Sequence, residues 1–401
     1  MERRIFIFLV FFAVRALSQA TYEWVNIDCG TETNYEDRYG LQWVTDDEFI
    51  WTGKNKQVSS SVVVLEQMES LRFFTEQNKN CYSIPASTGV RYFIRAAFFY
   101  GNYDGISNPP TFDLEIDGNK WVTVVTSITE TVYHEVIYMA KGENISVCVT
   151  RTRDNEFPFI SSIETWPLPK EMYAGMDRNF AWLKSYRYRY GGTDTIWYPD
   201  DNYKRIWDPL NPSGLIPVTA DFTSLISSTV DDPPEKGLLK AVEAENPTDS
   251  INLEFPFPNS NRFTYLSIYY AEMTELFNDT RSFGFVVDGQ DLDLIVSPSY
   301  QICSGIWSKT KSSGPLTVDL NPAEGSTLPP IISLIEVYSA SDPLITTGTS
   351  LDDMNGLDAF ISSFTKLQGW SGEPCLPSDT VWQWLNCSGD DPPRITSMYD
   401  F

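Results

Sequence analysis

Aromatic side chains gather at the end of one predicted strand, in the stretch RYFIRAAFFYGNYDG from Arg91 to Gly105. Sugars bind by stacking their C–H faces on aromatic rings, while a few polar groups hold the hydroxyls. From strand alternation we expect Phe98 to face the core and Tyr100 to lie at the solvent edge. The stretch therefore suggests a carbohydrate-binding platform, and packing of all these rings in the core is the alternative.

Acidic and imidazole groups offer little catalytic chemistry. Hydrolysis of a glycoside needs two carboxylates roughly 5–10 Å apart. Neither Asp46-Asp47 nor Asp200-Asp201 supplies that pair alone, because neighbouring strand residues point to opposite faces. We interpret both doublets as turn-capping carboxylates and the single histidine, His134, as structural. Without a spaced oxygen-ligand loop for calcium or a histidine cluster for zinc, we expect a non-enzyme with no cofactor or metal.

The first residues, MERRIFIFLVFFAVRALSQA, have a charged start, an apolar run and small residues at a cleavage site. This layout predicts a secretory signal peptide over residues 1–20, too short for a stable membrane span. No later stretch is apolar enough to span a membrane. Three glycosylation sequons begin at Asn144, Asn278 and Asn386. We therefore expect a secreted glycoprotein of the cell surface or apoplast.

Six cysteines in a secreted chain predict disulfides, although spacing alone does not choose the pairs. Proximity favours a bond between Cys375 and Cys387. A bond between Cys29 and Cys81 is favoured because both lie in motifs of the first domain. Two further cysteines could pair with each other or remain buried thiols: Cys148 and Cys303.

The charge balance restricts the class of partner. The chain has 29 Lys+Arg against 54 Asp+Glu, a formal net charge of −25. A field of that sign repels phosphate backbones and anionic lipid surfaces, so we expect neither nucleic acid nor membrane as a ligand. The aromatic content of 14%, with 25 Pro and 23 Gly, is typical of a loop-rich β protein.

An internal repeat organises the chain. TFDLEIDGNKWVTVV, with its turn at Asp117-Gly118, recurs as SFGFVVDGQDLDLIV, with its turn at Asp288-Gly289. Such turn pairs between short β-branched runs predict hairpins, and strands at this spacing favour a β-sandwich. We expect an all-β protein with two tandem sandwich domains, at 24–168 and 179–340, docked into one rigid unit near the linker 167–175.

Residues 350–401 have a different pattern. Apolar residues at helical spacing predict a short helix, and the two nearby cysteines predict a disulfide-closed cap. The final PPRITSMYDF has the pattern of the first strand of a leucine-rich repeat. One partial repeat cannot stack on a neighbour, so we expect a truncated or alternatively ended array.

Longer motifs resemble one family, the plant malectin-like receptor ectodomains that precede leucine-rich repeats. The motifs are NIDCG from Asn26, NCYSIP from Asn80, RYFIRAAFFYGNYDG, PPTFDLEIDGNKW, YRYGG and YPDDNYKRIW. The resemblance covers 24 to about 400 and implies tandem malectin-like sandwiches at the front of a receptor kinase. The repeat array, membrane helix and kinase are lacking, so we expect no autonomous signalling. The linker motif Gly-Asp-Pro-Cys reads Gly-Glu-Pro-Cys here, ending at Cys375.

The resemblance also implies ligand-contacting positions, matched to the carbohydrate cleft of the animal namesake. They are Phe99, Tyr100 and Asp154, with Tyr39 and Tyr103 as weaker additions. We expect an extracellular recognition module that binds a cell-wall glycan through this aromatic cleft. The alternative is a protein- or peptide-interaction module that docks on or competes with full-length receptor kinases and binds no sugar.

Overall fold

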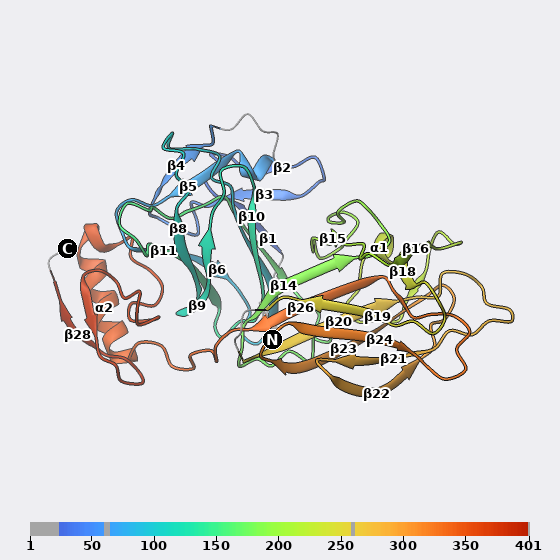
Figure 1. Ribbon diagram of the computed structural model, residues 1–401. Coiled ribbons are helices and arrows are strands. Elements are labelled where there is room, and N and C mark those ends of the chain that lie inside the picture. Colours follow the sequence, from blue (N-terminus) through green and yellow to red (C-terminus); the bar gives the residue numbers. More distant parts are fainter. Residues whose placement is uncertain (1–23, 60–64, 258–260, 400–401) are drawn as a thin grey trace, which may run out of the picture.

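The computed structural model describes residues 24–59, 65–257 and 261–399, so the predicted signal peptide lies outside the described residues. Their strands form two β-rich bodies that lie side by side (Figure 1). We call the part from β1 to β13, residues 25–167, the first body, and the part from β14 to β26, residues 182–340, the second body. Within the described ranges, no helix is long and apolar enough to cross a membrane.

One large sheet runs through both bodies. It is continuous because β10 of the first body pairs antiparallel with β14 of the second, with Val136 opposite Leu183 and Ile137 opposite Trp182. A short strand, β15 (Asp208–Pro209), adds to β14. Across the sheet the other strands are β17 (Ile226–Ser227), β23 (Ile302–Ser312), β20 (Arg262–Tyr270), β26 (Leu334–Ala340), β14 (Trp182–Arg189), β10 (Val132–Met139), β7 (Arg91–Phe98), β13 (Ser162–Pro167), β1 (Val25–Asp28), β3 (Gln42–Thr45) and β2 (Tyr35–Glu36).

In the first body, a second sheet closes the sandwich over the large sheet. Apolar side chains from both sheets, such as Ile94, Phe98 and Leu114, meet in one buried cluster. A short 3₁₀ turn, η1 (Glu66–Met68), lies beside the large sheet. The second sheet is β6 (Lys79–Pro85), β11 (Asn144–Thr150), β8 (Thr111–Ile116) and β9 (Asn119–Val125), and a smaller one is β12 (Phe159–Ile160), β5 (Ser70–Phe73) and β4 (Lys54–Gln57).

The second body repeats this plan with a core of its own, which includes Leu266, Phe285 and Val337. Its one helix among the described residues is short, α1 (Glu235–Leu238). Its second sheet is β19 (Ile251–Phe255), β24 (Leu316–Pro322), β21 (Phe283–Val287) and β22 (Gln290–Val296), and a smaller one is β16 (Leu215–Thr219), β18 (Lys240–Ala244) and β25 (Ile331–Ile332).

The two predicted hairpins are confirmed. β8 and β9 join through Asp117 and Gly118, whose φ angles are 44° and 72°. β21 and β22 join through Asp288 and Gly289, with φ angles of 51° and 75°. Two successive residues with positive φ are what a tight two-residue turn between twisted strands requires, and Asp-Gly pairs adopt them readily. The repeated sequence motif therefore forms the same type of hairpin in both bodies.

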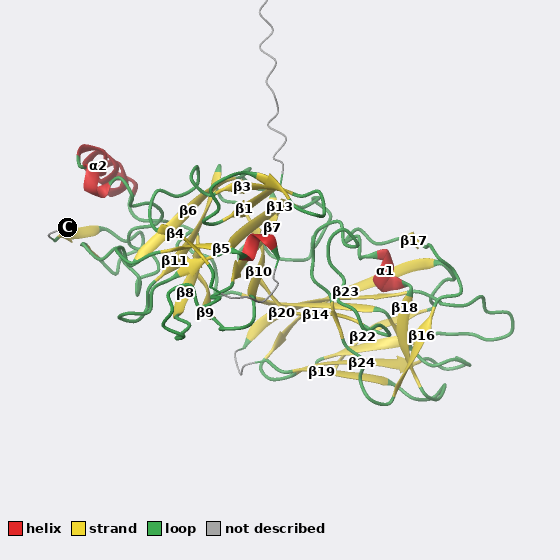
Figure 2. Ribbon diagram, turned by 90° about the horizontal axis from the view of Figure 1, so that it is seen from above, coloured by secondary structure: helices red, strands yellow, loops and turns green. Residues whose placement is uncertain are grey.

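The C-terminal segment packs against the second sheet of the first body (β6, β11, β8 and β9), away from the second body (Figures 1 and 2). The predicted helix is present as α2 (Leu351–Ser363), followed by η2 (Thr365–Leu367) and by the strand pair β27 (Leu385–Cys387) and β28 (Ile395–Met398). The Lys79 ammonium donates to the carbonyl oxygen of Leu376 at 2.8 Å, and the Thr380 hydroxyl donates to Glu115 at 2.6 Å. These buried contacts attach the segment to the sandwich.

The disulfides agree with one expected pair and contradict the other. Cys375 is bonded to Cys387 as predicted. The predicted Cys29–Cys81 bond is wrong, because Cys81 is bonded to Cys148. These two residues lie opposite each other on the paired strands β6 and β11, a relation that only the strand register reveals. The remaining cysteines are buried thiols: Cys29 and Cys303.

Candidate functional site

The predicted aromatic platform is not at the surface. Phe98, Phe99 and Tyr100 each have 0% exposed surface, and Tyr103 is also buried. The expected outward position of Tyr100 is wrong because residues two apart on an extended chain share a face. Phe98 and Tyr100 accordingly lie in the same core cluster, while Phe99 on the opposite face is covered by Met68. A sugar cannot stack on rings that have no exposed surface.

Of the predicted ligand-contacting residues, Tyr100 and Tyr103 pack edge to face in the core, with ring centroids 5.5 Å apart, whereas Phe99 belongs to another buried cluster. The Tyr100 hydroxyl donates to the Asp104 carboxylate at 2.5 Å, which closes the turn around it. Asp154 is exposed on a loop after β11. Tyr39 lines a cavity, and that cavity lies between the two bodies.

The histidine and the acidic doublets are built into the fold. Burial lowers the pKa of His134 to about 4, so the ring is neutral at physiological pH. Asp46 and Asp47 both bind the Arg72 guanidinium, at 2.6 and 2.9 Å. Asp201 binds Arg205 in the same manner, at 3.0 Å. Asp201 also accepts the backbone N–H groups of Tyr203 and Arg205, at 2.8 and 3.1 Å, so it caps a turn as we expected. Ion pairing adds to this role, and it involves the buried Asp46 and Asp201 as well as the exposed Asp47.

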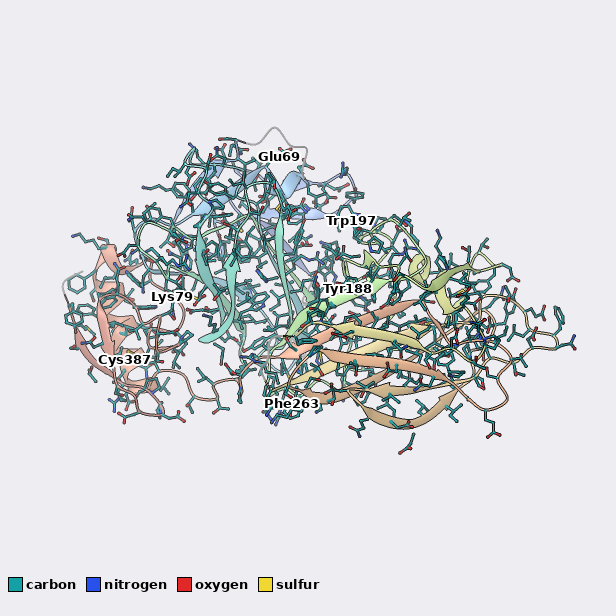
Figure 3. All side chains as sticks on the ribbon, in the orientation of Figure 1. Glu69, Lys79, Tyr188, Trp197, Phe263 and Cys387 are labelled. Carbon is teal, nitrogen blue, oxygen red and sulfur yellow. A yellow bond between two sulfur atoms is a disulfide. The ribbon has the colours of Figure 1, made fainter. Side chains whose placement is uncertain are left out.

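A cavity of about 270 Å³ lies where the first body faces the second, and we call it the interbody cleft. One side is formed by the β2–β3 hairpin and the segment around η1, and the other by the loop after β14. Figure 3 labels Glu69 on the first side and Trp197 on the second. Its lining residues are Asp37, Arg38, Tyr39, Leu41, Trp43, Leu65, Glu66, Gln67, Glu69, Arg95, Tyr133, Glu164, Trp197, Tyr198, Lys204 and Ile206.

The wall formed by the hairpin is held rigid by one carboxylate. Asp37 Oδ1 accepts the backbone N–H groups of Tyr39 and Leu41, at 2.8 and 3.0 Å. Its Oδ2 accepts the indole N–H of Trp43 at 3.0 Å. Tyr39 then reaches across the cleft and meets Trp197 edge to face, with ring centroids 4.9 Å apart. The two bodies thus contribute one ring each to a fixed aromatic pair.

The floor of the cleft is charged but internally neutralised. The Lys204 ammonium, from the second body, lies 3.0 Å from Glu164 Oε2 and 3.9 Å from the centre of the Trp166 ring, both in the first body. Burial lowers the pKa of Lys204 to about 8, although Glu164 acts in the opposite direction. Burial acts to raise the pKa of Glu164, but Lys204 and Arg95 outweigh it and hold that pKa below its usual value. The floor therefore carries fixed, paired charges.

The rim of the cleft carries charges that remain available to a ligand. Glu66 and Glu69 are exposed, and no described residue forms an ion pair with either carboxylate. On the hairpin of the same side, the exposed Arg38 guanidinium lies 4.9 Å from the Tyr39 ring centre, in a cation–π contact. Carboxylates that have no ion-pair partner and lie beside aromatic rings can recognise a polar or cationic group of a ligand. The charges on the floor are already paired with one another, so the rim supplies the charges that a ligand can pair with.

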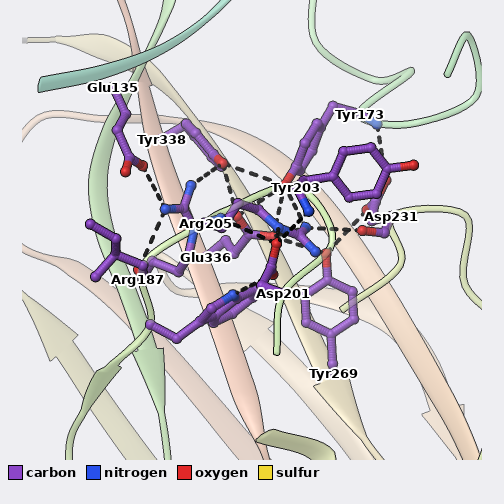
Figure 4. A network of polar contacts seen from close by, with 12 residues as sticks. Glu135, Tyr173, Arg187, Asp201, Tyr203, Arg205, Asp231, Tyr269, Glu336 and Tyr338 are labelled. Atoms are coloured by element: carbon purple, nitrogen blue, oxygen red, sulfur yellow. Dashed lines mark hydrogen bonds and ion pairs between the residues drawn. The ribbon is translucent and has the colours of Figure 1, made fainter. Parts of the chain in front are cut away.

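Buried ion pairs connect the two bodies in a continuous chain, and Figure 4 shows the part of it from Glu135 to Asp201. The chain crosses the boundary at the Lys204–Glu164 pair and again at Glu135, which accepts from Arg95 at 2.7 Å and from Arg187 at 2.5 Å. Burial acts to raise the pKa of Glu135, but these two guanidinium groups hold it well below its usual value. Along the chain, cations and carboxylates alternate in the order Lys204, Glu164, Arg95, Glu135, Arg187, Glu336, Arg205 and Asp201.

Sequence reasoning missed this chain and the floor of the cleft, because their members come from distant segments. One signal was present: Arg95 interrupts an otherwise apolar and aromatic strand. A charged residue in a buried strand needs a partner of opposite sign, so it predicts a buried ion pair. Within the described residues no cluster of His, Cys, Asp and Glu could hold a metal ion. The arrangement suits non-covalent recognition.

A match to a family model extends over most of the two bodies. The model for the malectin-like domain matches residues 27–340. The chain belongs to the malectin-like domain family. Both sandwiches and the interbody cleft lie within this malectin-like region, whereas α2 and the last strand pair follow it.

Curated relatives of this malectin-like chain are plant receptor kinases. It is 33% identical over 429 residues to the probable LRR receptor-like serine/threonine-protein kinase At1g05700 of Arabidopsis thaliana, covering 99% of this chain and 49% of the relative. It is 30% identical over 419 residues to At1g51810 of the same organism, a protein with the same description, covering 99% and 47%. The chain thus spans about half the length of the curated relatives it matches.

Solved structures share the malectin-like fold. The ANX2 ectodomain of Arabidopsis thaliana superimposes with a TM-score of 0.68 at 15% identity, over 80% of this chain and 97% of that one. A second match, at a TM-score of 0.67 and 17% identity, covers 80% and 96% and comes from a structure described as plant peptide RALF23 in complex with FER and LLG2. At these identities the likeness concerns the fold.

Proposed function

We propose that this chain is the extracellular recognition part of a plant receptor-like kinase, and that it binds a protein or peptide segment in the interbody cleft. The observation that carries the proposal is the cleft itself, to which both bodies contribute aromatic rings and the first body contributes exposed carboxylates. The structure that contains a peptide together with FER and LLG2 has the same fold, which supports a peptide ligand.

The shape of the cleft favours side chains over a sugar platform. Its volume of about 270 Å³ lies just below the range of about 300–1,000 Å³ typical of small-molecule sites. Tyr39 and Trp197 meet edge to face, so neither offers an open flat ring across the cavity. One or two side chains of a peptide fit this space better than the stacked rings of an oligosaccharide.

The same proposal assigns the remaining parts of the chain. We infer malectin-like domains at 24–168 and 179–340, a helical linker with a partial leucine-rich-repeat N-terminal cap at 350–401, and a secretory leader at 1–20. The separate core of each body and the disulfide-closed segment after α2 support this division. The asparagines of all three sequons are exposed and open to glycosylation: Asn144, Asn278 and Asn386.

A binding assay with residues 21–401 tests the site and the ligand class together. The protein is immobilised and exposed to fractions of apoplastic fluid, before and after treatment with protease or with glycosidases. We expect protease to destroy the bound component and Glu66→Lys/Glu69→Lys to abolish binding. The matched control, Glu130→Lys/Glu324→Lys, makes the same charge change at exposed positions outside the cleft and should bind normally.

Two results would contradict the proposal. A bound component that resists protease and is lost with glycosidases would make carbohydrate the ligand. Equal binding by the Glu66→Lys/Glu69→Lys variant and its control would mean that the cleft is not the site. Thermal melting of each variant confirms that loss of binding does not reflect loss of the fold.

A further inference from the structure

An exposed tryptophan and two exposed lysines alternate along β23, on the outer strand of the second body. Trp307, with 56% of its surface exposed, is followed by Lys309 and Lys311, which are also exposed. Residues two apart on a strand share a face and lie roughly 6.5–7 Å apart. The three side chains therefore form a regular row, which we call the β23 row.

The strand that carries this row has an open edge. On its inner side β23 pairs with β20 from Ser304 to Ser312. On its outer side, β17 pairs only with Ile302 and Cys303. Beyond Cys303, no strand of the described residues covers the outer edge. An uncovered edge presents unpaired backbone N–H and C=O groups that can accept another strand.

The cations of the row are free for a partner. No described carboxylate lies within ion-pair distance of Lys309 or Lys311, although the chain as a whole is strongly acidic. Their ammonium groups lie 5.8 and 5.7 Å from the centre of the Phe263 ring, which Figure 3 labels at the border of the second body. Two unpaired cations on a fixed aromatic base are complementary to carboxylates at matching spacing.

Trp307 is exposed but held in place. Its ring stacks on Tyr265 with centroids 5.6 Å apart and planes inclined by 17°. Gly175 of the segment between the bodies lies so close that an added Cβ would stand 2.7 Å from the Trp307 ring. A rigid, exposed indole offers apolar contact area at little cost in conformational entropy, as in many interface anchors.

We propose that β23 binds an extended acidic segment of a partner protein by strand addition. The added segment places alternate carboxylates opposite Lys309 and Lys311 and an apolar side chain against Trp307. Backbone hydrogen bonds to the open edge supply the affinity, and the alternate side chains supply the selectivity, as in other cases of strand addition. This surface is separate from the interbody cleft, so the inference does not depend on the function proposed for the cleft.

Lysines on an edge strand also have a purely protective role, since they discourage unwanted pairing. That role predicts that no added strand binds. A peptide of alternating glutamate and valine, with its backbone unmodified, is the probe that separates the two roles. Its affinity for residues 21–401 is measured by titration calorimetry, together with the quenching or shift of tryptophan fluorescence.

We expect the glutamate–valine peptide to bind, and Lys309→Glu/Lys311→Glu to lower its affinity about tenfold or more. Trp307→Ala should lower the affinity about fivefold, in line with the loss of an aromatic contact. The matched control is Lys54→Glu/Lys56→Glu, because β4 is also the last strand of its sheet and carries exposed lysines two apart, but no tryptophan. This control should bind as the unaltered protein does.

Several outcomes with peptides would overturn the inference. They are no binding of the glutamate–valine peptide, equal binding of a lysine–valine peptide, an equal loss of affinity in the β4 control, and unchanged affinity for a peptide whose alternate backbone nitrogens are methylated. Binding of anionic vesicles or of an acidic polysaccharide that displaces the peptide from the same lysines, with no sensitivity to backbone methylation, would also overturn it in favour of those surfaces.

Discussion

Removing the charge of Glu135 should weaken the attachment between the two bodies. The carboxylate is fully buried and accepts from Arg95 of the first body and Arg187 of the second, at 2.7 and 2.5 Å. Removing one charge of a buried ion pair lowers the free energy of unfolding by about 3–5 kcal/mol, because the partner charge stays buried without a counter-charge. Since Arg95 keeps Glu164 and Arg187 keeps Glu336, we expect Glu135→Gln to cost about 3 kcal/mol, the lower end of that range.

Differential scanning calorimetry and urea unfolding of residues 21–401 measure this cost. A loss of about 3 kcal/mol corresponds to a fall in Tm of roughly 6–12 °C for a cooperative unit of 150–250 residues. The control is Glu76→Gln, whose exposed pair with Lys54 at 3.7 Å should contribute about 0–1 kcal/mol. Equal Tm values for Glu135→Gln and Glu76→Gln would refute the reasoning that the buried chain of ion pairs stabilises the two-body arrangement.

The same variant has a characteristic pH dependence. The folded-state pKa of Glu135 lies below its unfolded value, so the ionised carboxylate contributes stability above the unfolded pKa of about 4.3. That contribution is lost as the pH falls from about 4.3 toward the folded-state pKa. The difference in unfolding free energy between the unaltered protein and Glu135→Gln should therefore be constant near neutral pH and shrink in acid. A difference that instead grows in acid would contradict the assignment.

Three further predictions follow from burial and pairing. Phe98→Ala and Tyr100→Ala should each lower the free energy of unfolding, measured in urea, by about 3–5 kcal/mol, because both rings are in the core. An unchanged free energy of unfolding for Tyr100→Ala would contradict the burial of that ring. Peptide mapping without reduction should recover Cys81 bonded to Cys148, and reduction should destabilise the first body by about 2–4 kcal/mol. The imidazole of His134, the only histidine, should titrate near pH 4 in NMR. The free energy of unfolding should then rise with pH between about 4 and 6.5, because in this range the unfolded chain loses the proton of its imidazole while the folded ring is already neutral. A measured pKa near 6.5 would contradict the burial of His134.

Local pattern in the sequence was enough to determine the class of fold and its repetition. The Asp-Gly pairs at 117–118 and 288–289 specify tight turns through their own backbone preferences, and the flanking runs specify strands. The proximity of Cys375 and Cys387 likewise predicted their bond correctly. These features depend on residues a few positions apart, which is the range over which propensity and alternation act.

Only the tertiary structure decided which surfaces are available. Cys81 pairs with Cys148 because the register of β6 on β11 places them opposite each other, which position in a shared motif cannot reveal. Tyr100 is buried because the turn after β7 folds back over the core, although the strand itself ends at Phe98. The interbody cleft exists because β10 pairs with β14, which brings Trp197 to Tyr39 across a long separation in sequence. Each of these contacts joins segments whose approach depends on the whole packing, so no local pattern of residue types encodes it.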